Sequence, residues 1–340
     1  MIPFGHGPPP PHPPGAPPGS GPGPMTGLAW ELFHREPGDW LDDVARLGAG
    51  PFQTVLGLRA SGVAGEPIYL RCSDRQGRCV SLAAGLGPRR RIPFLKGEVL
   101  FPSVPVCGPG LDAGSVVPGL LETLRRSHAR AVRFDSFDAQ CAGLEGLGTP
   151  RPRREYRVAI LAPDAQLAAL ADTHRRRVDQ GDREGWSLER FEGDRAREAM
   201  RAVKAGTAQR ASRKGRAFEL AGEAWDPSDL VPPGETRLGG AVWAAMADGV
   251  LLSAVTVIWA GDRAFYVEGG STPAGYAAVA SHWMHTRIMN ALGSTGIRLY
   301  NMGGAPVGAH EPASPHHGLH RFKMGFGAHE VRVQGAVITL

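Results

Sequence analysis

The chain has 340 residues, which is more than one hydrophobic core usually fills, so we expect two domains. Hydrophobic residues make up 42% and charged residues 21%, as in an ordinary globular protein, which excludes a fibrous chain and argues against wholesale disorder. No apolar run approaches the length of a membrane span, and a net charge of +5 is compatible with an anionic partner without requiring one.

Residues 1–24 are almost entirely proline and glycine. They have neither the basic start nor the apolar run of a secretory signal, so we expect a disordered, partly polyproline tail. The alternative role for this tail is a docking arm for a proline-binding partner. Met25 follows directly and opens a normal folded sequence, so it is an alternative start of the protein.

The four cysteines all lie in the first half of the chain, at Cys72, Cys79, Cys107 and Cys141. Their spacing fits neither a paired zinc motif nor a small disulfide framework. We therefore expect buried, reduced thiols in a cytoplasmic protein.

The elements expected up to residue 148 begin with a helix over 37–48, which has proline at its start and glycine after its end. The rest of this part contains a hairpin of two strands over 66–74 and 78–86, and a further strand over 97–104. A helix over 116–129 and a half-buried strand over 131–137 follow. The basic, proline-bearing segment Thr149 to Glu155 is then the best domain boundary, as a connector.

Beyond this connector the order of strands and helices starts again. The expected elements are a strand over 156–162, a helix from Pro163, a strand over 186–192, a helix over 194–213, strands over 239–249, 250–260 and 262–270, a helix over 274–292, and strands over 297–302 and 331–340. The short turns between three of the strands predict an antiparallel meander, which argues against a doubly wound parallel sheet. The sequence therefore predicts two related α/β units.

The most informative stretch runs from residue 249 to residue 333. A strand pair ends in the small-residue turn Gly269-Gly270-Ser271, a helix carries Trp283, a strand ends in LYNMGGAP, and GLHRFKMGFGAHEVRV follows. This order resembles the C-terminal half of the Fem-type (FemABX-like) aminoacyltransferases. The basic helix ADTHRRRVDQGDREG is also similar to that family, and PFQTVLGL near Pro51 is a weak echo of its N-terminal segment.

The resemblance implies an α/β fold of two tandem acetyltransferase-like (GNAT) domains with mixed, largely antiparallel sheets. We place these domains at 25–148 and 149–340, and we allow for the last strand to pack on the first domain. The implied reaction moves an amino acid from aminoacyl-tRNA to a primary amine and forms an amide. It needs no cofactor beyond the aminoacyl-tRNA donor, and no DNA or stable membrane insertion.

The acceptor implied by the resemblance is an amine-bearing peptide or cell-wall precursor. The residues with which wall-synthesis members hold a nucleotide diphosphate have no match here. The interval 194–240 is also too short and interrupted for the helical hairpin of some members. A peptide intermediate of a natural-product pathway is therefore as reasonable an acceptor as a peptidoglycan precursor.

The FKMGFG segment supplies the predicted catalytic residues, Lys323 and Phe322. An ammonium on a flexible stem suits a point charge beside a developing oxyanion or a phosphate, and Gly325 and Gly327 would let the backbone approach a ligand closely. In the alternative interpretation Phe322 and Phe326 pack a turn while Lys323 stays solvated.

The predicted substrate-binding residues lie in four segments of the second half. On the basic helix, Arg175 or Arg176 would contact phosphates, although a solvated face fits the run of three arginines, which ends at Arg177, as well. The hydroxyls of two tyrosines could contact a substrate, with core packing as the alternative. The remaining positions belong to the small-residue turn, the glycine pair and the FKMGFG segment. Besides the two arginines, the predicted substrate-binding residues are therefore Tyr266, Ser271, Tyr300, Gly303, Gly304 and Gly325.

We predict no metal site. A group of four histidines precedes the FKMGFG segment, but its spacing matches no common site and the prolines around it indicate an exposed loop; its members are His310, His316, His317 and His320. His282 and His285 lie three apart on a helix without an evident third ligand, so we interpret them as helix-surface residues. A general base is not obvious, and Asp262 and Glu268 are candidates only by location.

Two other classes of function compete with aminoacyl transfer. The first is an N-acyltransferase that uses an acyl-CoA thioester, since acetyltransferase-like domains commonly bind coenzyme A. The segments RLGAG and RLGGA have a suitable composition for its pyrophosphate, but neither lies between an expected strand and a following helix. The second is a binding protein that kept the fold after losing activity, against which the intact FKMGFG segment argues.

Overall fold

The first half of the chain is a run of short strands and helices that the sequence pattern largely anticipates. In the computed structural model, which describes residues 27–88, 97–127, 129–140, 144–213, 215, 224–232, 234–306 and 308–340, its elements are β1 (Ala29–Phe33), α1 (Trp40–Arg46), η1 (Pro51–Gln53), α2 (Val55–Ala60), β2 (Glu66–Ser73), β3 (Cys79–Gly87), β4 (Glu98–Phe101), β5 (Val106–Cys107), α3 (Ala113–Arg126) and β6 (Ala131–Phe134). The expected tail and Cys141 lie outside the described residues.

The second half repeats this alternation with longer elements. They are β7 (Thr149–Ala159), α4 (Pro163–Ala169), α5 (Asp172–Arg183), β8 (Ser187–Phe191), α6 (Gly193–Arg213), η2 (Pro227–Leu230), β9 (Leu238–Ala247), β10 (Val250–Ala260), β11 (Arg263–Ser271), α7 (Pro273–Ala278), α8 (Ser281–Gly293), β12 (Leu299–Gly304), α9 (His317–Met324) and β13 (His329–Thr339). Among the described residues no helix is long and apolar enough to cross a bilayer.

The thirteen strands of the described residues belong to one continuous sheet, with β5 beside β3 and the others in the order β1-β2-β3-β4-β6-β13-β7-β12-β11-β10-β9-β8. In each half three antiparallel strands are followed by a helix and by a strand parallel to the third, as in β2-β3-β4-α3-β6 and β9-β10-β11-α8-β12. The mixed, largely antiparallel α/β fold with two related units is thus confirmed, although the two units share one sheet.

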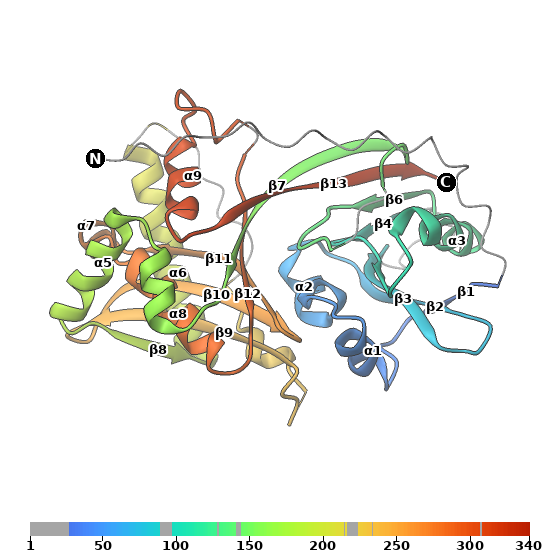
Figure 1. The fold of residues 1–340 in the computed structure, drawn as a ribbon, viewed down its shortest axis with the longest axis horizontal. Helices are drawn as coiled ribbons and strands as arrows, with labels where there is room; N and C mark the ends of the chain where they lie inside the picture. The colour runs from blue at the N-terminus through green and yellow to red at the C-terminus, as the bar shows by residue number, and fades with distance from the viewer. Residues whose placement is uncertain are drawn as a thin grey trace, which may run out of the picture.

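The long antiparallel pair β7 and β13 joins the two halves (Figure 1). β13 also pairs with β6, so the last strand of the chain lies between the two units. The prediction of a connector over Thr149 to Glu155 is wrong in its local structure, because this segment begins β7. Pro150 and Pro152 are tolerated there because β12 pairs with β7 only from Glu155 onward, which leaves one edge free of hydrogen bonds.

Four clusters of buried side chains hold this sheet and its helices together. Two of them lie within the second half, one under α8 and one under α6, and alternate residues of β9 contact each: Ala245 the first, Val242 and Ala244 the second. Helices α6 and α8 therefore cover opposite faces of the sheet. A third cluster fills the first half around α3, and the fourth spans both halves, with Phe52 of η1 against Phe265 of β11.

Two elements of the second half differ from the prediction. The single helix expected over 274–292 is two helices, because Val279 adopts a left-handed conformation (φ 58°) that ends α7 before α8 begins. The long loop expected before the last strand contains α9, which carries Phe322 and Lys323 on a helix instead of a turn. His317 and His320 therefore lie on this helix, whereas His310 precedes it in a turn.

Candidate functional site

A pocket of about 640 Å³ opens against the second half of β11, beyond the residues that pair with β12. The two parallel strands pair only over the first three residues of each, from Arg263 with Leu299 to Phe265 with Asn301, and β11 then continues alone to Ser271. Helices α5, α6, α7, α8 and α9 supply most of the remaining lining of the pocket. The polar and aromatic side chains that line it are Thr173, His174, Arg210, Tyr266, Ser271, Tyr276, Ser281, His282, His285, Arg321 and Phe322.

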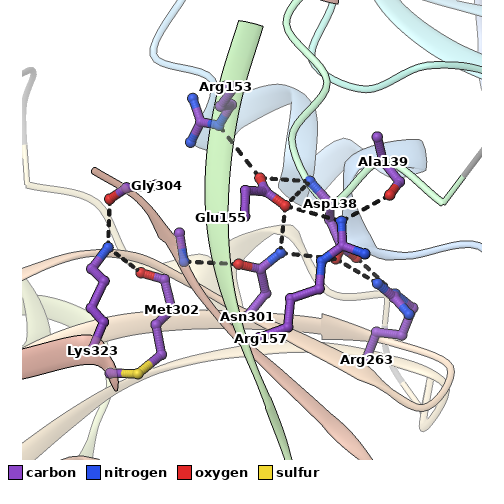
Figure 2. Close-up of polar contacts among 11 residues, drawn as sticks. Asp138, Ala139, Arg153, Glu155, Arg157, Arg263, Asn301, Met302, Gly304 and Lys323 are labelled. Carbon is purple, nitrogen blue, oxygen red and sulfur yellow. Dashed lines mark hydrogen bonds and ion pairs between the residues drawn. The ribbon is translucent and has the colours of Figure 1, made fainter. Parts of the chain in front are cut away.

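Lys323 lies beside this pocket, on the side of α9 that faces β12. Its side chain is buried, with 4% of the residue exposed, and its Nζ donates to the carbonyl oxygens of Met302 at 2.7 Å and Gly304 at 2.5 Å (Figure 2). An ammonium group has three N–H donors, so one is left for a ligand. Burial, together with the positive charge of Arg153, lowers the pKa of Lys323 to about 7.

The end of β12 is shaped around this lysine. Its register with β7 shifts between Asn301 and Gly304, and Gly303 has a φ of +69°, which favours glycine. The Gly303 N–H donates to Asn301 Oδ1 at 2.8 Å. A side chain at Gly303 would begin 4.0 Å from Lys323 Nζ and 3.6 Å from the carbonyl oxygen of Tyr266. The absent side chain therefore leaves a gap of about one methyl group, the open spot at Gly303, between Lys323 Nζ and the carbonyl oxygen of Tyr266.

Behind Asn301 lies a buried polar network that sequence reasoning missed (Figure 2). The Asp138 carboxylate accepts from Nε of Arg263 at 2.8 Å, from Nη2 of Arg263 at 2.6 Å and from Nδ2 of Asn301 at 3.0 Å. Glu155, with no exposed surface, accepts from Asn301 Nδ2 at 2.9 Å and from the Asp138 backbone N–H at 3.0 Å, and Arg157 donates to it at 3.1 Å. The local sequence does not mark this network. What distinguishes Asp138 is its left-handed backbone conformation, which a sequence does not display.

Three histidines surround Phe322 on the pocket side of α9. His282 Nδ1 donates to the carbonyl oxygen of Val279 at 3.2 Å, and its ring centroid lies 5.0 Å from that of Phe322 and 4.3 Å from that of His174. His285 is buried and its Nδ1 lies 2.9 Å from the Tyr300 hydroxyl, so its interpretation as a helix-surface residue is wrong. The break at Val279 turns α8 so that both rings face inward.

Burial keeps these imidazoles uncharged. It lowers the pKa of His282 to about 4 and that of His285 to about 3, with further repulsion from the neighbouring histidines, and it also lowers the pKa of His174. Since a carbonyl oxygen can only accept, His282 carries its proton on Nδ1, and Nε2 keeps a lone pair. His282 is thus a neutral proton acceptor in the wall of the pocket.

Gly325 packs closely against the ring of His174. A Cβ at this position would overlap the imidazole, whose Nε2 lies 2.8 Å from the carbonyl oxygen of Phe322. The predicted role of Gly325 in substrate binding remains a prediction, but its missing side chain is used by His174. The contact fixes the end of α9, and with it the position of Lys323.

The predicted residues beyond α9 are brought together in part. Tyr266 and Ser271 line the pocket, where the Ser271 hydroxyl lies 2.7 Å from that of Ser253, while Tyr300 is fully buried behind it. Arg175 forms an ion pair with Asp172 on the surface of α5.

Arg176 is exposed, and neither it nor Arg175 lines the pocket. The third arginine of this run, Arg177, acts on the site electrostatically, because its charge contributes to the lowered pKa of His282.

Other candidates from the sequence lie elsewhere. Glu268 pairs with Lys204 at 2.9 Å and Asp262 lies in the turn before β11, and neither lines the pocket. His320 Nδ1 lies 3.0 Å from the Tyr156 hydroxyl. In the described part of the chain no three His, Cys, Asp or Glu side chains are arranged to hold a metal ion.

Only two of the described cysteines are buried. Cys72 and Cys79 are buried, which raises the pKa of Cys72 to about 11 and that of Cys79 to about 12. Cys107 is half-buried, so the prediction of a buried thiol is wrong for this residue.

Comparisons with known proteins bear on the same elements. Residues 168–324, which include α5 through α9 and hence the pocket, match the acetyltransferase (GNAT) domain family. The crystal structure of FemX superposes with a TM-score of 0.67 at 14% sequence identity, over 91% of this chain and 97% of that one. The chain therefore has a Fem-type GNAT fold.

Two further solved structures share this Fem-type fold. One is a conserved protein of unknown function from Bacteroides thetaiotaomicron VPI-5482, with a TM-score of 0.54 and 9% identity over 87% of this chain and 91% of that one. The other is L-PGS from Bacillus licheniformis, with a TM-score of 0.51 and 10% identity over 89% of this chain and 91% of that one. No curated protein matches the sequence. Together these results support the coarser prediction of a transferase with a GNAT fold.

Proposed function

We propose that this protein is an aminoacyltransferase that moves an amino acid from the 3′ ester of an aminoacyl-tRNA to a primary amine. The observation that carries the proposal is Lys323, which is buried beside the pocket with one N–H donor free next to the open spot at Gly303. It lies in the FKMGFG segment through which the sequence resembles the Fem-type transferases. The acceptor we propose is a peptidoglycan precursor or a peptide intermediate of a natural-product pathway.

The proposed reaction is aminolysis of an activated ester. The amine nitrogen attacks the ester carbonyl, a C–N bond forms, the bond to the ribose oxygen breaks, and the products are an amide and deacylated tRNA. Because the ester supplies the driving force, the chain must only align the two reactants and stabilise the oxyanion. Lys323 would do the latter from the open spot at Gly303, with Phe322 and Tyr266 beside the reacting groups.

His282 is our candidate for handling the proton. The amine must lose one proton as the C–N bond forms, and the ribose oxygen must gain one as it leaves. His282 Nε2 would accept the first and then return it to the leaving oxygen, while the Nδ1–H bond to Val279 fixes the ring and its tautomer. Neither step uses a metal ion or a redox cofactor, and we place the reaction in the cytoplasm, where the donor is made.

The second candidate is an N-acyltransferase that uses an acyl-CoA thioester. It is favoured by the match of residues 168–324 to the acetyltransferase family. Against it, RLGAG follows α1 and RLGGA leads into β9, so neither glycine segment connects a strand to a following helix. The same pocket and the same Lys323 would serve either donor, which leaves the donor itself to experiment.

A release assay distinguishes the two donors. The full chain would be offered a pool of labelled aminoacyl-tRNAs or, separately, labelled acetyl-CoA, with cell-wall precursors and small peptides as acceptors in both arms. We expect transfer of label to an amide from the RNA arm, abolished by prior RNase treatment. Transfer only from the thioester would overturn the aminoacyl-tRNA proposal and establish the second candidate.

Lys323→Met provides the matched variant for this assay, since it keeps the length of the side chain and removes the charge. Loss of one preorganised donor to an oxyanion typically costs about 10²- to 10³-fold in turnover. Unchanged transfer by Lys323→Met would show that Lys323 only holds the carbonyls of β12.

A further inference from the structure

A second, smaller pocket of about 270 Å³ adjoins the first on the surface of α6. The two pockets share Arg210 and Tyr276, so the hollow continues from the candidate site to the end of α6. Its lining comes from the last two turns of α6 and from α7, and consists of Gly206, Gln209, Arg210, Arg213, Pro273, Tyr276 and Ala277.

Close packing places the end of α6 at this position. A side chain at Gly206 would overlap the carbonyl oxygen of Ser271, so α6 crosses directly over the turn between β11 and α7. At the next residue, the Thr207 hydroxyl donates to the carbonyl of Val203 at 2.8 Å and lies 2.9 Å from the Tyr276 hydroxyl. The floor of the small pocket is therefore rigid.

Among the described residues, the charged side chains that line the smaller pocket, Arg210 and Arg213, are both positive. The segment 199–213 contains four basic residues and no acidic one. Lys204 is paired with Glu268, but within the part of the chain that the structure describes Arg210 and Arg213 form no ion pair with a carboxylate. The Arg210 guanidinium instead lies 4.2 Å from the ring centroid of Tyr276, and both residues line the two pockets.

We propose that this smaller pocket binds phosphate groups of the nucleotide end of the acyl donor. A guanidinium held on an aromatic face is suited to phosphate oxygens, and no carboxylate of the described residues pairs with it. The inference rests on the proposed function only for the identity of the donor. It adds a direction: the donor enters from the α6–α7 side, with its acyl carbonyl toward Phe322 and Lys323.

The same phosphate chemistry is found in the 3′ end of a tRNA and in the diphosphate of coenzyme A. Binding measurements can therefore be made on each without any catalysis. We would titrate the full chain with a fluorescent, deacylated RNA hairpin that ends in CCA, and with coenzyme A, at several salt concentrations. The variants are Arg210→Ala and Arg213→Ala.

Arg201→Ala is the matched control. Arg201 is exposed on the same helix nine residues before Arg210, which places it about 180° around the helix axis. We expect Arg210→Ala and Arg213→Ala each to weaken RNA binding about 3- to 10-fold and to reduce the slope of log affinity against log salt by about 0.7. Arg201→Ala should leave both the affinity and the slope unchanged.

The outcomes separate this inference from the proposed function. If the arginine variants weaken coenzyme A but not RNA, the phosphate site stands and the tRNA donor fails. If wild-type protein binds neither probe, or if all three variants behave alike, the phosphate site is overturned, whereas the release assay still decides the proposed function independently.

Discussion

Lys323 is the residue on which the proposed chemistry depends, and its pKa of about 7 means that its charged and neutral forms are both populated near neutral pH. Two carbonyl oxygens and Tyr156, whose ring centroid lies 5.5 Å away, surround an ammonium that burial disfavours. A neutral amine could still donate to both carbonyls, but it would have no N–H left for an oxyanion. Protonation of Lys323 therefore decides whether the oxyanion is stabilised.

This balance predicts a pH effect that is specific to Lys323. Because its pKa is lowered to about 7, the ammonium is lost as the pH rises through 7, whereas an arginine keeps its charge. We expect the ratio of kcat/KM for wild type to that for Lys323→Arg to fall about tenfold per pH unit above 7. The ratio cancels the ionisation of the acceptor amine. A ratio that stays flat between pH 6 and 9 would show that charge on Lys323 is not required.

His282 should affect the rate in a different manner. Its pKa is lowered to about 4, so it is neutral throughout the range in which the protein is assayed. We expect His282→Ala to reduce kcat by about 10²-fold, the lower end of the range for a general base, because a pKa of about 4 makes the imidazole a weak base. The loss of activity above pH 7 that Lys323 causes should be unchanged in this variant. His282→Asn tests whether the hydrogen bond to Val279 alone restores activity. Wild-type rates in both variants would remove His282 from the mechanism.

At the scale of the element, α9 has two glycines with opposite surroundings, Gly318 in its first turn and Gly325 at its C-terminal end. A side chain at Gly325 would overlap His174, whereas one at Gly318 would meet nothing within 4 Å. We expect Gly325→Ala to lower the free energy of unfolding by about 1–3 kcal/mol through overpacking. Gly318→Ala, on the same helix, should raise it by up to about 1 kcal/mol. Equal effects in urea denaturation would contradict the packing of His174 on α9.

Helix α8 predicts acid sensitivity of the fold. His282 and His285 have lowered pKa values in the folded protein, whereas an unfolded histidine titrates near 6.5. Below pH about 6.5 the unfolded chain binds more protons, so stability is lost as the pH falls toward 4. Each histidine contributes up to about 1.4 kcal/mol per pH unit in this window.

The measurement is the free energy of unfolding in urea at pH 5, 6 and 7.5. His285→Gln should reduce the dependence on pH by one proton, while its amide can still reach the Tyr300 hydroxyl. An unchanged slope in this variant would show that His285 is already protonated in the folded state.

For the whole molecule, the polar network around Asp138 connects strands of both halves. Asp138 follows β6, Glu155 and Arg157 lie on β7, and Arg263 and Asn301 lie on β11 and β12. Their charges are paired and buried, so the removal of one partner leaves another without compensation. The network is therefore a joint between the halves that also supports Asn301 and the end of β12.

Removal of the Asp138 carboxylate tests this joint. We expect Asp138→Ala to lower the free energy of unfolding by about 3–5 kcal/mol, because Arg263 would lose its partner in a buried site. Asp172→Ala is the control, since its ion pair with Arg175 is exposed and should matter by less than about 1 kcal/mol. A single transition seen by both fluorescence and circular dichroism would show that the halves unfold together. Two separate transitions in wild type would contradict such coupling.

The sequence by itself determined most of the elements and the coarse class of the protein. Hydrophobic alternation located the strands of the antiparallel meander, because that signal is local and repeats every two residues. The FKMGFG segment pointed to Lys323, and the glycine pair before it pointed to Gly303 and Gly304, which do meet Lys323 in space. Chain order alone was enough for these inferences.

Only the tertiary structure decided how distant segments complete the site. Asp138, Glu155 and Arg263 are far apart in the chain and meet because β7, β11 and β12 are brought together in one sheet. His282 becomes a pocket residue through the left-handed turn at Val279, which is set by packing and not by local propensity. Burial also moves the pKa of Lys323 to about 7, because desolvation depends on every neighbour that excludes water. These contacts are non-local, and so no window of sequence contains them.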